Sequence, residues 1–236
     1  IDLSNVLKEQ IDSLWQVDPD NFIEMVDDRV YISNLMFSHN MQSIRVDGYA
    51  PMHDSDTLGV QLRRFDISNL DFLFNGFDLN GFVSGDALVG NMKETPMVLA
   101  DIRVDQIEVN NEPMGDATIS TSWNNEDKSV DLQARVFNKE RRMLEVNGLY
   151  YTARKKDNLD FTAELDSLRL VSLSPLLVGI VSRMQGYGDG TIDITGSLDQ
   201  PEVNGRIKLI DAGCHIDYLN SFYTLSPSIL IDNQSI

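Results

Sequence analysis

Apolar side chains recur at every second position along most of this 236-residue chain, beginning near residue 30. In residues 130–136 and 159–165, each apolar side chain is followed by a polar one. A strand points successive side chains to opposite faces, so this period gives a sheet with one apolar and one polar face. Turn-forming clusters such as residues 110–113 and 124–127 separate the runs. The pattern predicts an all-β fold, an antiparallel meander of about 14 strands.

The beginning of the chain follows a different period. Apolar residues recur at every third or fourth position through the first fifteen residues, which is typical of one face of a helix. Asp18 followed by Pro19 then favours the start of a second helix, with the aspartate as its N-cap. We therefore expect a helical segment at residues 1–29 and a β domain at residues 30–236.

One short helix is expected inside the β domain. Ser174 followed by Pro175 combines an N-cap residue with a favourable first helical residue, and apolar residues follow up to a glycine-rich segment. These signals predict a helix over residues 175–184. A single apolar helix among strands usually covers an open end or edge of the sheet.

Glycines stand repeatedly in phase with the apolar residues, inside strands rather than in turns. Glycine weakens a strand and usually marks a bend or a close approach of other atoms. Two interpretations are open: bulges that curve an ordinary sheet, or a strongly curved sheet whose apolar face keeps open space. The glycines of this kind are Gly48, Gly81, Gly148, Gly196 and Gly205.

The charge balance argues against several classes of partner. The chain has 19 Lys+Arg against 37 Asp+Glu, a net charge of -18. Nucleic-acid affinity depends on cations that neutralise phosphates, so no nucleic-acid partner is expected. Attachment to an anionic lipid surface through basic residues is disfavoured for the same reason.

Few motifs in the chain suggest catalysis or a cofactor. Cys214 is the one cysteine, which excludes an intrachain disulfide and a thiolate zinc site. The polar run at residues 53–56, the only metal-like or acid–base cluster, is expected to be a solvated turn. The carboxylates between apolar strand positions are expected on the solvated face. We predict no catalytic residue, no metal site and no cofactor.

The last third of the chain resembles a known family. The motif comprises Leu173-Ser174-Pro175-Leu176-Leu177, the glycine-rich run and strand at residues 186–198, and residues 201–209, where Gly205 follows Pro201 and Val203. Together they resemble the C-terminal region of the translocation and assembly module TamB family, whose wider relatives are the AsmA-like envelope proteins. The resemblance covers residues 165–236 well. In residues 40–165 it is limited to the general pattern of alternating strands that contain glycines.

The resemblance implies a fold and a function. Members of this family are anchored in the inner membrane of bacteria with two membranes and extend through the periplasm. They form a long, curved antiparallel sheet, U-shaped around an apolar groove. They are implicated in moving phospholipid toward the outer membrane and in assembling outer-membrane proteins with an Omp85-type partner. By this resemblance the chain is a periplasmic fragment of a longer protein, with its membrane anchor outside the sequence.

The strand phase selects the residues expected to line such a groove. A continuous apolar trough would shield acyl chains without any polar recognition, because each methylene gains about 0.8 kcal/mol on leaving water. The family likeness favours this role over packing in a closed core. The expected lining residues are Val98, Ile102, Val104, Val130, Leu132, Val146, Ile192, Ile194, Leu198, Val203, Ile207 and Leu209.

Two other functions remain open from the sequence. The chain could act as a chaperone or scaffold for outer-membrane proteins, binding partner strands at exposed sheet edges. It could also be a closed β-sandwich adhesin or glycan-binding module with surface aromatics. A sandwich requires two sheets packed face to face, whereas a groove requires one layer with an open apolar side.

Overall fold

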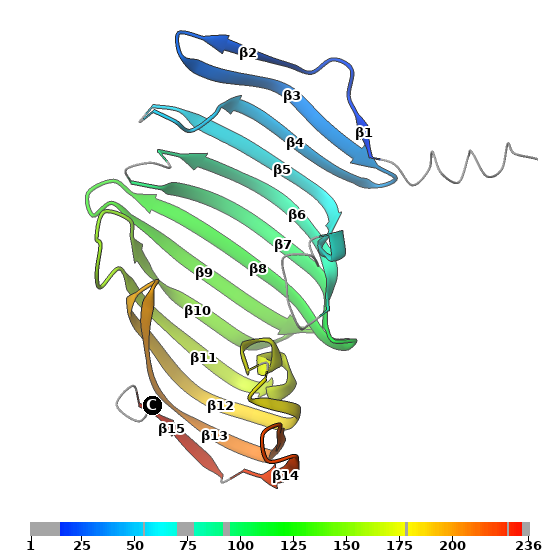
Figure 1. The fold of residues 1–236 in the computed structure, drawn as a ribbon, viewed down its shortest axis with the longest axis vertical. Helices are drawn as coiled ribbons and strands as arrows, with labels where there is room; N and C mark the ends of the chain where they lie inside the picture. The colour runs from blue at the N-terminus through cyan, green and yellow to red at the C-terminus, as the bar shows by residue number, and fades with distance from the viewer. Residues whose placement is uncertain are drawn as a thin grey trace, which may run out of the picture.

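The computed structural model is a single, open antiparallel sheet of fifteen strands (Figure 1). The prediction of an all-β fold is confirmed, at close to the expected number of strands. The structure describes residues 15–53, 55–69, 78–91, 95–177, 179–225 and 227–232. The helix expected before residue 15 lies outside the described residues.

The strands follow one another in chain order. The first eight are β1 (Gln16–Val17), β2 (Phe22–Val26), β3 (Arg29–His39), β4 (Gln42–Tyr49), β5 (Thr57–Asp66), β6 (Leu79–Gly90), β7 (Met97–Val109) and β8 (Glu112–Asn124). The rest are β9 (Ser129–Asn138), β10 (Arg141–Tyr151), β11 (Leu159–Arg169), β12 (Val181–Ser197), β13 (Gln200–Ile216), β14 (Ser221–Thr224) and β15 (Ser228–Ile231). A 3-10 helix, η2 (Leu170–Leu177), separates β11 from β12.

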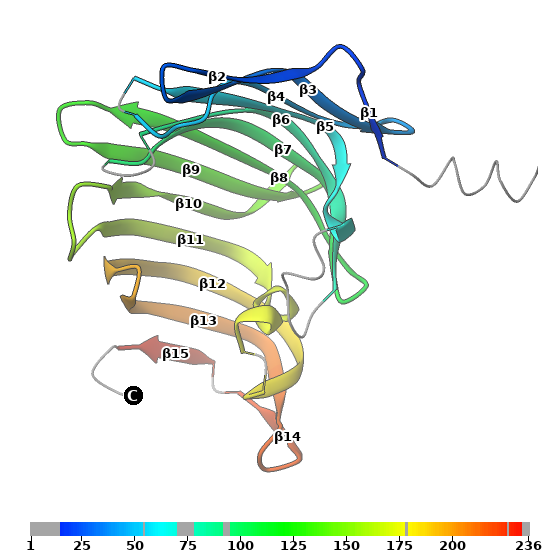
Figure 2. The same cartoon turned by 45° about the horizontal axis from the view of Figure 1, so that its top comes forward.

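Each strand from β3 to β13 pairs with the next one in the chain, so this part of the sheet is a meander of antiparallel strands. Two short strands share each outer edge. At one end β1 and β2 both pair with β3, and at the other β14 and β15 both pair with β13. The sheet twists along its length, and strands such as β5 and β13 bend toward one end (Figure 2).

The prediction of a helix starting at Pro19 is wrong. Asp18 caps only a turn, accepting a hydrogen bond from the amide of Asp20 at 2.8 Å. Residues 22–26 form β2, which pairs with β3 through a turn in which Asp27 and Asp28 both have positive φ. Two successive positive φ values match the twist of a tight hairpin, so pairing with β3 overrides the local helix signal. Residues 16–26 therefore belong to the same sheet as the rest.

The prediction of a helix over residues 175–184 is wrong in its boundaries and type. The helical turn comes earlier, as η2, and β12 already begins at Val181, which pairs with Ile216. Gly179, with φ of 81°, lies between the two elements. Leu170 is buried and Leu173 packs against the same apolar cluster, so η2 does cover part of the sheet as expected.

Candidate functional site

One face of the sheet is apolar along ladders that cross ten strands, from β4 to β13. Directly opposed residues in an antiparallel pair point to the same face, so the strand registers define these ladders. The first ladder is Val46, Val60, Ala87, Ala100, Thr121, Leu132, Gly148, Phe161, Ile194 and Val203. The second is Ile44, Leu62, Gly85, Ile102, Ile119, Ala134, Val146, Ala163, Ile192 and Gly205. We call this side the apolar face.

A third ladder lies between the first and the second, and its side chains point to the opposite face of the sheet. It contains no apolar residue over the same ten strands. Its members are Arg45, Gln61, Asp86, Asp101, Ser120, Gln133, Asn147, Thr162, Asp193 and Asn204. The two faces of one layer thus differ sharply in polarity. A contrast of this kind indicates that one face meets water and the other meets something apolar.

Eleven of the twelve expected lining residues lie on the apolar face. The exception is Leu198, which lies in the turn between β12 and β13 and is 62% exposed. Its position continues the phase of β12, but the strand ends at Ser197. The sequence prediction missed the continuation of the face through β4 to β6, where Ile44, Val60 and Leu62 carry the same alternation.

The apolar face is covered at one end, and elsewhere the described residues place no second layer of strands against it. Beneath η2, a closed cluster buries Met143, Ala163, Leu165, Leu168, Leu170, Ile207, Leu209 and Ala212. Of the expected lining residues, Ile207 and Leu209 are buried in this cluster, Val146 and Ile192 pack against it, and Val130 is also buried. Over the described part of the chain, the main contacts of every strand are with its neighbours in the sheet, and η2 lies against β11 and β12. Ile102, Leu132 and Ile194 remain partly exposed.

The in-phase glycines point to the apolar face, as expected. Gly48 pairs with Ile32, Gly148 with Leu132 and Phe161, and Gly205 with Ile192. A Cβ added to Gly148 would overlap the backbone of the next strand, only 2.5 Å from the Cα of Phe161. These glycines are thus explained by close approach of neighbouring strands, which favours the interpretation as bends in the sheet.

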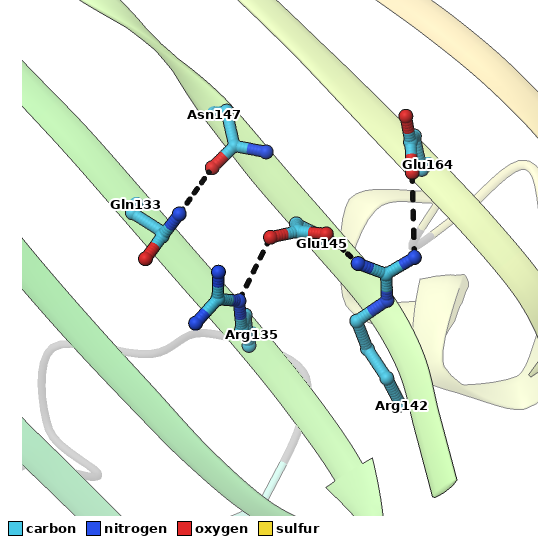
Figure 3. A network of polar contacts seen from close by, with 6 residues as sticks. All are labelled: Gln133, Arg135, Arg142, Glu145, Asn147 and Glu164. Carbon is cyan, nitrogen blue, oxygen red and sulfur yellow. Dashed lines mark hydrogen bonds and ion pairs between the residues drawn. The ribbon is translucent and has the colours of Figure 1, made fainter.

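The polar face carries a network of ion pairs over β9, β10 and β11 (Figure 3). Glu145 accepts a hydrogen bond from Arg135 at 2.8 Å and forms an ion pair with Arg142, which also lies 3.5 Å from Glu164. A bulge at Met143 turns that side chain into the apolar cluster and leaves Arg142 and Glu145 on one face. Glu145 is only 7% exposed, so the expectation of a fully solvated carboxylate is wrong for this residue.

Glu145→Gln should lower the free energy of unfolding by about 1–2 kcal/mol, because two arginines lose the charge of a shielded carboxylate. The arginines are partly exposed, which keeps the loss below that of a fully buried pair. Urea unfolding measures it. Glu164→Gln is the matched control: its carboxylate is exposed and should contribute less than about 0.5 kcal/mol. Equal losses in the two variants would contradict a special role for Glu145.

The polar run at residues 53–56 is not simply a solvated turn. Asp56 is fully buried and forms an ion pair with Arg29 from the start of β3, whereas His53 is exposed; residue 54 lies outside the described part. The guanidinium of Arg29 also lies over the ring of Tyr49, 4.0 Å from its centroid. The aspartate therefore ties the β4–β5 connection to β3, which gives it a structural role.

A serine, a histidine and an aspartate meet where β12 begins and β13 ends. The hydroxyl of Ser182 donates to Asp217 Oδ1 at 2.5 Å, and His215 Nδ1 lies 3.3 Å from the same oxygen. A catalytic relay requires the imidazole between hydroxyl and carboxylate, whereas here the hydroxyl binds the carboxylate directly. Hydrogen bonds from Ser182 and His215 lower the pKa of Asp217 below its usual value. The cluster holds this carboxylate against the strands.

A hollow of about 620 Å³ lies over β4 to β8, and none of the expected lining residues contributes to it. Most of its wall comes from residues that alternate with the apolar ladders, among them Gln61, Asp86, Leu88 and Leu99. It therefore opens on the polar side of the sheet.

The described residues lack both a metal-binding cluster and a membrane-spanning helix. They contain no group of three or more histidine, cysteine, aspartate or glutamate side chains placed to hold a metal ion. They also contain no helix with the length and apolar character needed to cross a bilayer. Comparison of the chain with family models, curated proteins and solved structures gives no match.

Proposed function

We propose that the apolar face binds the acyl chains of phospholipids and shields them from water. The observation that carries this proposal is the pair of apolar ladders across ten strands of a single-layer sheet, backed by a wholly polar ladder. Ten strands span about 45 Å at the usual spacing, and the first ladder runs outside the closed cluster beneath η2 along this whole length.

Physical chemistry favours a lipid over a specific polar ligand. Each methylene removed from water gains about 0.8 kcal/mol, and the gain is non-directional, so a smooth apolar surface is sufficient. The ladder residues are aliphatic, phenylalanine, threonine or glycine and offer no charged group for recognition. A polar head group would remain in solvent while the tails lie along the sheet. We propose that the bent sheet closes around the tails as a groove.

The resemblance of residues 165–236 to the TamB family extends the proposal to a cellular setting. In that setting the chain is the periplasmic part of an envelope-biogenesis protein. It transfers phospholipid between the inner and outer membranes and acts with an Omp85-type outer-membrane protein. A binding function of this kind needs neither a catalytic residue nor a cofactor.

A second candidate function, strand addition to a partner protein, is favoured by the outer edges of the sheet. Ile23 in β2 and Leu230 in β15 are exposed on strands that have one unpaired edge within the described residues. Both edges are interrupted, however, by segments containing Pro19 and Pro227. Broken edges with proline hinder strand addition, so lipid binding has the stronger support.

Lipid extraction tests the proposal. The protein, purified from a phospholipid-containing host without detergent, should yield phospholipid in native mass spectra and after solvent extraction. The stripped protein should then bind a fluorescent fatty acid that competing phospholipid displaces. Failure to find bound lipid, together with failure to bind the fluorescent fatty acid, would contradict the proposed function. Crosslinking of a partner strand to β2 or β15 instead would favour the second candidate.

A further inference from the structure

An exposed apolar patch lies at the end of the hairpin that β13 and β14 form, and Figure 2 shows this hairpin projecting from the sheet. In the turn, Tyr218 is 93% and Leu219 is 50% exposed, and Ile180 and Phe222 beside them are also exposed. Large apolar side chains gathered at a projecting turn are unusual on a water-facing surface. We call these four residues the tip patch.

The tip patch is assembled from two segments far apart in sequence. Ile180 lies just before β12, and its carbonyl accepts a hydrogen bond from the amide of Asp217 at 3.2 Å. The next pair along, Val181 and Ile216, continues the β12–β13 ladder. The backbone thus holds Ile180 beside the β13–β14 turn in a fixed arrangement.

Several polar groups of the turn are satisfied by hydrogen bonds within the turn or to the adjoining strands. The amide of Asn220 donates to the carbonyl of Asp217 at 3.2 Å, and the Ser221 hydroxyl donates to the carbonyl of Leu219 at 3.2 Å. Asp217, the only charged residue of the turn, accepts hydrogen bonds from Ser182 and His215 on the strands. Hydrogen bonds already made inside the turn lower the cost of placing it in a less polar medium.

We propose that the tip patch docks the protein on the surface of a phospholipid bilayer by inserting apolar side chains among the head groups. Tyrosine suits this depth because its ring is apolar and its hydroxyl reaches water. The strongly acidic chain disfavours attraction to anionic lipid, so insertion rather than charge drives the contact. The inference rests on the proposed function, since it names the surface that exchanges lipid with the apolar face.

Sedimentation with phosphatidylcholine vesicles tests the docking. The double variant Tyr218→Ser/Leu219→Ser should lose at least about tenfold in partition coefficient, because two apolar side chains no longer insert. Leu198→Ser is the matched control: it removes an exposed leucine from the turn at the opposite ends of β12 and β13 and should bind vesicles like wild type. Raising the salt concentration should not weaken wild-type binding, whereas adding phosphatidylglycerol should.

A Tyr218→Trp variant measures how deeply residue 218 enters the bilayer. The fluorescence of the introduced tryptophan should be quenched by lipids brominated along the acyl chains. Equal vesicle binding by the tip variant and wild type would overturn the docking proposal. So would a tip variant that changes only the oligomeric state, because the patch would then be a protein interface. Bound lipid is measured separately: if wild type docks on vesicles but holds no lipid, the proposed function fails and the docking stands.

Discussion

Ile194→Asp should reduce binding of a fluorescent fatty acid by at least about tenfold while the sheet remains folded. Ile194 lies in the first apolar ladder between Phe161 and Val203, outside the closed cluster beneath η2. A carboxylate there would be desolvated by every acyl chain laid across it, and desolvating an unpaired charge costs more than the lost methylene contacts. Because the side chain is partly exposed when no lipid is bound, the unliganded protein keeps the charge hydrated.

The control for this variant adds the same charge to the other face of the same strand. Thr191→Glu places a carboxylate on the polar face, opposite Arg206 on β13 and Glu164 on β11. It should leave fatty-acid binding within about twofold of wild type, since no acyl chain crosses that face. Circular dichroism checks the fold of both variants. Equal loss of binding in the two, with both folded, would contradict the assignment of lipid to the apolar face.

Gly85→Ala should lower the free energy of unfolding by about 3 kcal/mol, a large effect for a single methyl group. Gly85 lies in β6 with φ of 142°, a conformation that residues with a side chain rarely adopt. The new Cβ would overlap the carbonyl oxygen of Asp101 and lie 2.9 Å from the Cα of Ile102. Both are backbone atoms of β7, so neither can move aside without distorting the sheet.

Gly59→Ala, in the adjacent strand β5, is the matched control for this variant. Its Cβ would meet only the carbonyl oxygen of Asp47, at an ordinary 3.5 Å. The free energy of unfolding should therefore change by less than about 1 kcal/mol, and the variant can be slightly more stable because its unfolded chain is less free. Chemical denaturation measures both variants. Similar values for the two would show that the bend at Gly85 does not depend on glycine.

Alternation in the sequence predicts most of this fold because each strand pairs with its neighbour in the chain. Local period and turn residues are then sufficient, and they identify the face on which eleven of the twelve expected residues lie. Alternation does not show where a strand ends, so Leu198 was assigned to the face although it lies in a turn. It also does not distinguish an open face from a covered one, as Ile207 beneath η2 illustrates.

The remaining errors come from contacts that local sequence does not contain. The capping signal at Asp18 and Pro19 is real but is overridden by pairing of β2 with β3. Asp56 is buried because Arg29, twenty-seven residues earlier, reaches it. Glu145 is shielded because the bulge at Met143, two residues earlier, places Arg142 on the same face as Glu145. Each depends on packing between segments, which a single sequence does not reveal.

The most direct measurement of lipid position is photocrosslinking from two neighbouring residues of β9. Leu132 belongs to the first apolar ladder and Gln133 to the polar ladder, so their side chains point to opposite faces of one strand. A benzophenone amino acid would be placed at each position in turn, and the protein loaded with a labelled phospholipid. The proposed function predicts a lipid adduct from position 132 and none above background from position 133. Equal adducts from both positions, or an adduct from position 133 alone, would contradict it.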